Sequence, residues 1–290
     1  MFLLFLLCNE QGKIDANDVI MTKCHLFLTV LATAFLAGCA ANTPDKSLSE
    51  YASSSQSAKL QAFRQYAESL DTLSLEQATA LQEERLAVKD SAAFQEEYGF
   101  QRLFFFDPNS PYRNEDYMVP VLGKVAESAY ATQEQRTQAG YFLPLFSLNG
   151  KGTVAADFAF TLKNGRTRSL HSVKGELKLL FFSNPGCEDC RRVTEALSAN
   201  PVVQDMIAGD QLTVVNIYPD ADIDAWLEHL SDYPQKWVCG YAPEVDDIVG
   251  DALPLYYLRA IPSLYLLDSE NRVLLKDAPV EKVIWRICRK

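Results

Sequence analysis

Between residues 58 and 150, apolar side chains recur with the spacing of amphipathic helices. Four successive apolar positions are separated by three, four and three residues: Leu60, Phe63, Ala67 and Leu70. That spacing places them on one face of a helix. Ser74 and Gln77 match a capping box that would open a second helix, and breaks at Asp107-Pro108 and Asn149-Gly150 separate further helical segments. The pattern predicts a small all-α domain over 58–150.

From residue 151 onward, short apolar runs alternate with amphipathic stretches. Three runs have the length and composition of buried strands: LKLLFF (177–182), QLTVVNIY (211–218) and SLYLLD (263–268). Asn164-Gly165 carries a hairpin signal, and the apolar spacing over 280–287 predicts a closing helix. A helix-like stretch is also expected to reach Arg259. We therefore predict an α/β fold for 151–290, a mixed sheet flanked by helices.

The N-terminal region has the pattern of an export signal. From Met21, a short basic head is followed by an apolar run and small residues up to Cys39. Translation is expected to begin at Met21, because the residues before it include three acidic side chains where a signal head should be basic. Residues 1–38 are interpreted as the signal region, and the polar, serine-rich residues 39–57 as a flexible tether.

Leu36-Ala37-Gly38-Cys39 resembles the lipobox of bacterial lipoproteins. The resemblance implies cleavage before Cys39 and lipidation of its thiol, and several acyl chains would anchor stably at about 0.8 kcal/mol per buried methylene. An ordinary secretory signal with a coincidental cysteine is the alternative. We expect a lipid-anchored protein of the bacterial cell envelope that faces the periplasm, where disulfides form and persist.

Composition and charge narrow the classes of partner. With 48% hydrophobic residues among 290, the chain can bury a sizeable core. The formal net charge of −11 argues against nucleic acid as a partner, because a polyanion would be repelled.

The segment SNPGCEDCRR places Cys187 and Cys190 where a predicted strand gives way to a helix. Unpaired N–H groups at a helix N-terminus stabilise a thiolate, so Cys187 would be the exposed nucleophile and the more buried Cys190 would resolve a mixed disulfide. A zinc site would need a second ligand pair, and Cys239 and Cys288 are isolated in the sequence. We expect neither a metal nor a cofactor. A structural disulfide is the main alternative to a redox couple.

Residues 152–290 resemble the thioredoxin fold, and more closely its membrane-tethered TlpA/ResA-like branch. The resemblance is carried by AADFAFTLKNGRTRSLHSVKGELKLLFFSNPGCEDC and, later, by YYLRAIPSLYLLD. It implies that Cys187 attacks, that Cys190 resolves, and that Ile261-Pro262 is a cis-proline step whose first residue offers backbone pairing to an extended substrate. The whole chain resembles a group of thioredoxin-like bacterial lipoproteins with an N-terminal helical domain of unknown function.

Two features depart from that pattern. Glu188 and Asp189 stand between the cysteines and disfavour a thiolate, although Arg191 and Arg192 partly offset them, so we expect a reducing couple. LKLLFF contains no acid to take the proton from Cys190, which leaves water or Glu188 for that role.

The sequence therefore predicts a membrane-anchored thiol-disulfide oxidoreductase that reduces or reshuffles disulfides of exported proteins. Its expected partners are exported thiol or disulfide proteins, with a membrane redox donor as a further candidate. The alternative is a redox-inert binding lipoprotein with a structural disulfide. Cys239 and Cys288 would form either a second disulfide or two buried free thiols.

Overall fold

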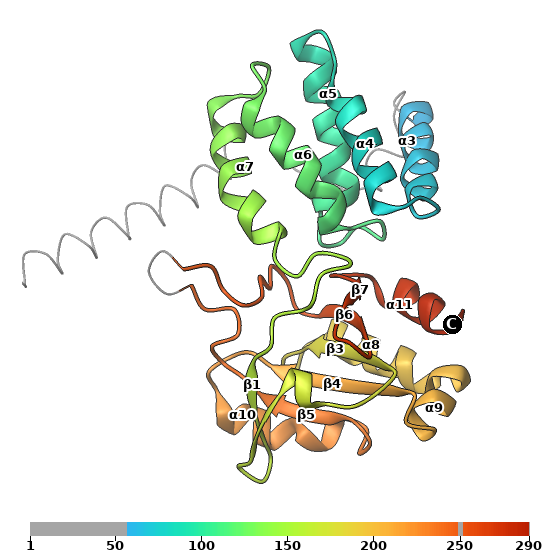
Figure 1. Cartoon of the computed structure of the whole chain (residues 1–290), viewed down its shortest axis with the longest axis vertical. Helices are drawn as coiled ribbons and strands as arrows, with labels where there is room; N and C mark the ends of the chain where they lie inside the picture. The colour runs from blue at the N-terminus through green and yellow to red at the C-terminus, as the bar shows by residue number, and fades with distance from the viewer. Residues whose placement is uncertain (1–56, 249–251, 290) are drawn as a thin grey trace, which may run out of the picture. The chain divides into compact units, whose positions relative to one another are not determined.

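A helical region comes first in the part of the chain that the computed structural model describes, residues 57–248 and 252–289. The expected signal region, the tether and Cys39 lie outside these residues. Its elements, drawn from blue to green in Figure 1, are α3 (Ser57–Leu70), α4 (Leu75–Leu86), α5 (Ser91–Gln101), the π-helix η1 (Arg102–Phe106), α6 (Glu115–Glu127) and α7 (Gln133–Phe146). The predicted helical region before the sheet is confirmed.

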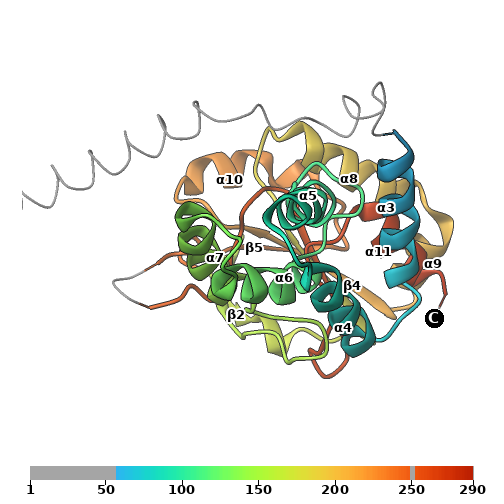
Figure 2. The ribbon, with the colours of Figure 1, turned by 90° about the horizontal axis from the view of Figure 1, so that it is seen from above.

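Local sequence explains where these helices begin. Ser74 caps α4 through the predicted capping box with Gln77, and Thr132 forms the same box with Gln135 at the start of α7. The apolar face predicted on α3 is buried. Helix α6 lies between α4 and α7 in both views of the molecule (Figure 1, Figure 2).

The second region is a seven-stranded mixed sheet in the order β2-β1-β5-β4-β3-β6-β7. Its strands are β1 (Ala159–Leu162), β2 (Thr167–Ser169), β3 (Leu177–Phe182), β4 (Leu212–Tyr218), β5 (Val238–Tyr241), β6 (Ser263–Asp268) and β7 (Val273–Leu275). Strands β3, β4 and β5 are parallel, whereas β6, β7, β1 and β2 join antiparallel neighbours. The prediction of a mixed sheet flanked by helices is confirmed.

Strand β3 lies inside the sheet and is buried along its whole length. Leu179 and Phe181 face a core covered by α8 (Glu188–Ala199), α9 (Pro201–Ala208) and α11 (Val280–Ile287). Leu180 and Phe182 face a second core, built with residues from the segments before β2 and after β5. A strand that is buried on both faces has a nearly continuous run of apolar residues. This explains why LKLLFF does not alternate between apolar and polar residues.

The segment between β5 and β6 is not helical in its described parts, so the prediction of a helix-like stretch reaching Arg259 is wrong. Pro243 and Pro254 lack the backbone N–H that a helix interior requires, which explains the irregular path. The remaining α-helix of this region, α10 (Ile223–His229), is short, and the region also contains the 3-10 helices η2 (Leu170–Ser172) and η3 (Leu230–Asp232). Among the described helices, none has the length and apolar character needed to cross a membrane.

A buried cluster of charges connects α6 to the sheet region. Glu115, 1% exposed, accepts from Arg259 Nε at 3.0 Å and pairs with Lys276 Nζ at 2.8 Å. Arg259 Nη2 also donates to Asp277 at 2.8 Å, and Arg259 bonds the Phe106 carbonyl at the end of η1. Because Arg259 lies two residues before Ile261, the cluster ties the loop that leads into β6 to the helical region.

Candidate functional site

The two cysteines lie at the junction between β3 and α8. Cys187 is the N-cap of α8, and its Sγ accepts the backbone N–H of Cys190 at 3.2 Å. Gly186, just before it, has φ +70°, a left-handed conformation that favours glycine and turns the chain into the helix. The structure places the pair at a helix N-terminus, as predicted. A backbone N–H of the first turn donates to the Cys187 sulfur, the atom that would carry the thiolate charge.

The environments of the two thiols differ strongly. Cys187 is half-buried, whereas Cys190 is 2% exposed and belongs to the core under α8. Burial, followed by the hydrogen bond with Cys187, raises the pKa of Cys190 to about 12. Cys190 is therefore a protonated thiol at neutral pH, while Cys187 is the one that a partner can reach.

The acidic pair between the cysteines points to solvent and is paired with the following arginines. Arg191 Nε donates to Glu188 at 3.1 Å, and Arg192 pairs with Asp189. The hydrogen bond from Arg191 lowers the pKa of Glu188. Because all four side chains are exposed, these pairs are screened by solvent and offset the charge of the two carboxylates only in part.

The Ile261–Pro262 peptide bond is cis, as the family resemblance implies. Ile261 and Cys187 both pack against the core cluster that contains Cys190. The candidate redox couple and the candidate substrate-contacting step, which are far apart in the sequence, thus share one core.

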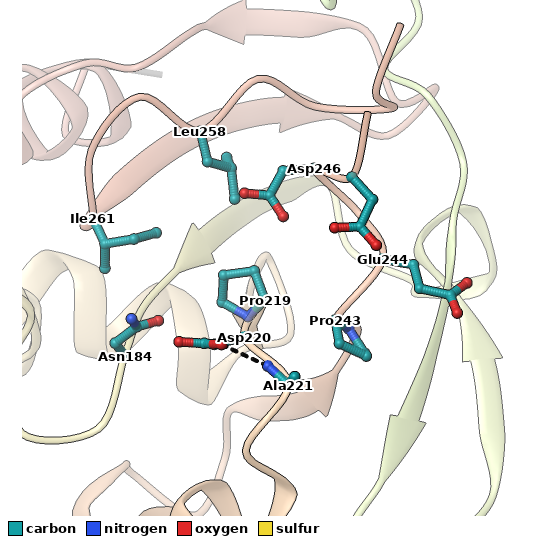
Figure 3. Close-up of a pocket in the computed structure, with 10 residues that line it drawn as sticks. Asn184, Pro219, Asp220, Ala221, Pro243, Glu244, Asp246, Leu258 and Ile261 are labelled. Carbon is teal, nitrogen blue, oxygen red and sulfur yellow. Dashed lines mark hydrogen bonds between the residues drawn. The ribbon is translucent and has the colours of Figure 1, made fainter. Parts of the chain in front are cut away.

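A cleft of about 500 Å³ borders this junction. Asn184 and Ile261 lie toward one end of it, and Pro243 and Glu244 toward the other (Figure 3). Four lining side chains are acidic: Asp220, Glu244, Asp246 and Asp247. None of the described lining residues is Lys, Arg or His. Burial raises the pKa of Asp246, and the neighbouring negative charges of Asp247 and Asp220 raise it further.

A polar chain runs beneath the couple on the Cys190 side of the sheet. The Asn216 amide Nδ2 donates to Ser183 Oγ at 2.7 Å, and Ser183 Oγ lies 2.9 Å from the Tyr233 hydroxyl. Ser183 and Asn216 are each 1% exposed. Asn216 lies opposite Phe181 in the β3–β4 pairing, and Phe181 belongs to the same core as Cys190.

The other two described cysteines are free thiols. Cys288 is exposed at the end of α11, 4.0 Å from Asn200 Oδ1, so the interpretation of two buried thiols is wrong for this residue. Cys239 on β5 is half-buried, and burial raises its pKa to about 11. Within residues 57–248 and 252–289, no group of three or more His, Cys, Asp or Glu side chains could hold a metal ion.

A mixed sheet, a Cys-x-x-Cys pair at the start of a helix and a cis-proline step packed on the same core define the thioredoxin-like class. No family model matches the sequence. The crystal structure of a thioredoxin-like protein from Bacteroides caccae superposes with a TM-score of 0.70 at 31% identity, covering 82% of this chain and 86% of that one. The chain belongs to this family of thioredoxin-like proteins.

Two further relatives match only part of the chain. The C-terminal domain of an uncharacterized protein from Bacteroides fragilis is 41% identical, with a TM-score of 0.45, and the match covers 48% of this chain and 98% of that one. Bovine nucleoredoxin is 26% identical over 129 residues, and the match spans 28% of that relative's length.

Sequence patterns identified the cysteine pair and the proline step but missed two parts of the site. One is the acidic cleft, whose carboxylates come from the segments after β4 and β5. The other is Tyr233 with its two polar partners. Two sequence signals could have pointed to these polar partners. Ser183 lies inside SNPGCEDCRR, and Asn216 is a polar residue within an otherwise apolar strand.

Proposed function

We propose that this protein is a thiol-disulfide oxidoreductase that reduces or reshuffles disulfides of exported proteins through Cys187 and Cys190. The single observation that carries the proposal is the asymmetry of the couple: an accessible thiol at a helix N-terminus beside a buried, protonated one. Cys187 attacks a substrate disulfide to give a mixed disulfide, and Cys190 then attacks Cys187 Sγ and releases the substrate.

The cell envelope is the proposed place of action, with lipidated Cys39 as the anchor. The export pattern of the N-terminus supports this placement, and an oxidising compartment supplies disulfides on which such a couple could act. Ile261 is proposed to contact the substrate backbone, since it lies between the cleft and the core that carries the couple.

The test is a trapping experiment in cells. Cys190→Ser blocks the second step, so exported substrates should accumulate as mixed disulfides that appear on non-reducing gels and disappear after reduction. The control is the double variant Cys187→Ser/Cys190→Ser, which should trap nothing. If the single variant also traps nothing, the redox role is wrong, and an inert binding protein with a structural disulfide becomes the better account.

The acidic cleft predicts a preference for disulfides flanked by Lys or Arg. Carboxylates beside the couple should attract such segments, and the rate advantage over a neutral peptide should be about tenfold at low ionic strength. It should shrink at high salt, because exposed charges are screened beyond about 8 Å at physiological ionic strength. Exchange rates with model peptides of each charge measure the effect.

Asp246→Asn should reduce that preference. Glu270→Gln removes the same charge from the exposed turn between β6 and β7, where Glu270 pairs with exposed Arg272, and should leave the preference unchanged. Equal effects of the two variants would attribute the preference to net charge instead of the cleft.

A further inference from the structure

The candidate substrate-contacting step is bracketed by two hydrogen bonds to one carboxylate. Arg259 Nη2 donates to Asp277 Oδ2 at 2.8 Å, and Ser263 Oγ donates to Asp277 Oδ1 at 3.4 Å. The cis peptide bond between Ile261 and Pro262 lies between these two donors in the sequence. Asp277 therefore holds the loop on both sides of the residue that is proposed to meet the substrate backbone.

The bracketing carboxylate is itself held in place. Asp277 follows β7, is 5% exposed and has φ +42°, a left-handed conformation that few non-glycine residues adopt but that aspartate tolerates. The preceding residue, Lys276, is also buried; it pairs with Glu115 at 2.8 Å and donates to the Phe146 carbonyl at 2.7 Å. The segment that carries Asp277 is therefore anchored to the helical region.

The helical region also supplies much of the surroundings of Arg259. Glu115 on α6 accepts from Nε at 3.0 Å, and the Phe106 carbonyl accepts from Nη1. The Phe106 and Phe146 ring centroids lie 5.6 and 5.4 Å from the guanidinium carbon, within the range of a cation–π interaction. A planar guanidinium with five N–H donors can serve Asp277, Glu115 and the carbonyl at once, whereas a lysine ammonium is a compact point charge that lacks this fork.

Two interpretations of this buried cluster differ in the role they give it. A buried ion-pair network is weak evidence for stability, because the desolvation of its charges offsets much of their attraction. Such a network can instead serve to fix one conformation. Here two of its bonds start from Arg259 and Ser263, on either side of the residue proposed to contact the substrate, which favours the second interpretation.

We infer that Arg259 is a positioning residue that holds the Ile261 backbone ready to pair with an extended peptide substrate, and that the helical region serves this step by anchoring Arg259. The inference rests on the proposed function. A loop already held in its binding conformation binds a peptide at a lower entropic cost than a free loop. A small disulfide without peptide bonds has no backbone to pair with Ile261, so its reduction does not depend on this arrangement. The helical region thereby favours polypeptide disulfides over small ones.

The test compares two disulfides that the full-length protein reduces in the presence of a small dithiol. One disulfide joins two extended peptides, and the other is bis(2-hydroxyethyl) disulfide, which contains no peptide bond. Both require the cysteine couple, but only the first can pair with the Ile261 backbone. The ratio of their kcat/KM values therefore reports on positioning and is insensitive to the fraction of protein that is folded.

Arg259→Lys keeps the buried charge but removes the guanidinium fork. We expect kcat/KM for the peptide disulfide to fall about tenfold, through a higher KM, while the value for the small disulfide changes by less than about twofold. Glu115→Gln keeps an oxygen acceptor for Arg259 and removes the charge, so the same selective loss should be about threefold. This second variant tests the contribution of the helical region.

The matched control is Arg85→Lys. Arg85 Nε and Nη2 donate to the two carboxylate oxygens of Glu97 at 2.7 Å each, in a bidentate pair between α4 and α5 that lies outside the cluster. This variant should leave the ratio unchanged. An equal loss on both disulfides in Arg259→Lys, or no loss on the peptide disulfide, would overturn the inference and leave the cluster as a stabilising contact. Failure of the unmodified protein to reduce either disulfide would overturn the proposed function, and the inference with it.

Discussion

Replacing Cys187 with serine is expected to abolish disulfide exchange. A serine hydroxyl is not ionised near neutral pH and cannot form a disulfide, so neither the attack nor the mixed disulfide is available. Cys190 cannot substitute, because it is almost fully buried and its pKa is about 12. Turnover of a model disulfide in the presence of a small dithiol reductant measures the loss.

Cys288→Ser is the control for this experiment. Cys288 is exposed at the end of α11, so it is the most accessible of the described thiols outside the candidate site, and its replacement should leave turnover unchanged. Residual turnover in Cys187→Ser that is lost when Cys288 is also replaced would show that a surface thiol performs the exchange. That result would contradict the assignment of Cys187 as nucleophile.

Replacing Glu115 with alanine is expected to lower the free energy of unfolding by about 3–5 kcal/mol. The carboxylate is 1% exposed and faces Arg259 and Lys276, whose side chains are 8% and 1% exposed. Removing it leaves two buried cations with less compensation, and an unpaired buried charge is far more costly than a missing surface pair. Chemical denaturation of the reduced protein measures the change.

The matched comparison is Glu270→Ala, which breaks an exposed pair with Arg272 and should cost less than about 1 kcal/mol. Similar losses in the two variants would mean that the Glu115 cluster contributes no more than a surface ion pair. A loss in Glu115→Ala without any change in the slope of the denaturation curve would indicate that the same cooperative unit still unfolds.

Much of the fold could be predicted because its signals are local. The apolar spacing of α3, the capping box of α4 and the unbroken apolar run of β3 each depend on residues close in sequence. The cysteine pair was predictable for the same reason. The helix expected before Arg259 was wrong, because Pro243 and Pro254 each remove a backbone donor that a helix interior requires.

The rest of the site depends on contacts between distant segments. Ser183, Asn216 and Tyr233 follow or belong to different elements, and only the pairing of β3 with β4 brings the first two together. Glu115 and Lys276 are of residue types that normally face solvent, so their burial could be recognised only when each was seen beside its counter-charge. Such convergence has no signature in a single stretch of sequence.

The charge cluster at Glu115 also bears on how the molecule can be dissected. A fragment that began near residue 151 would retain Arg259 and Lys276 but lose their shared carboxylate and the Phe106 carbonyl. Arg259 would keep its bond to Asp277, but the loop before Ile261 would lose its ties to the helical region. Measurements on such a fragment would therefore report on a loop held by fewer contacts than in the intact protein, even where the cysteine couple is unchanged.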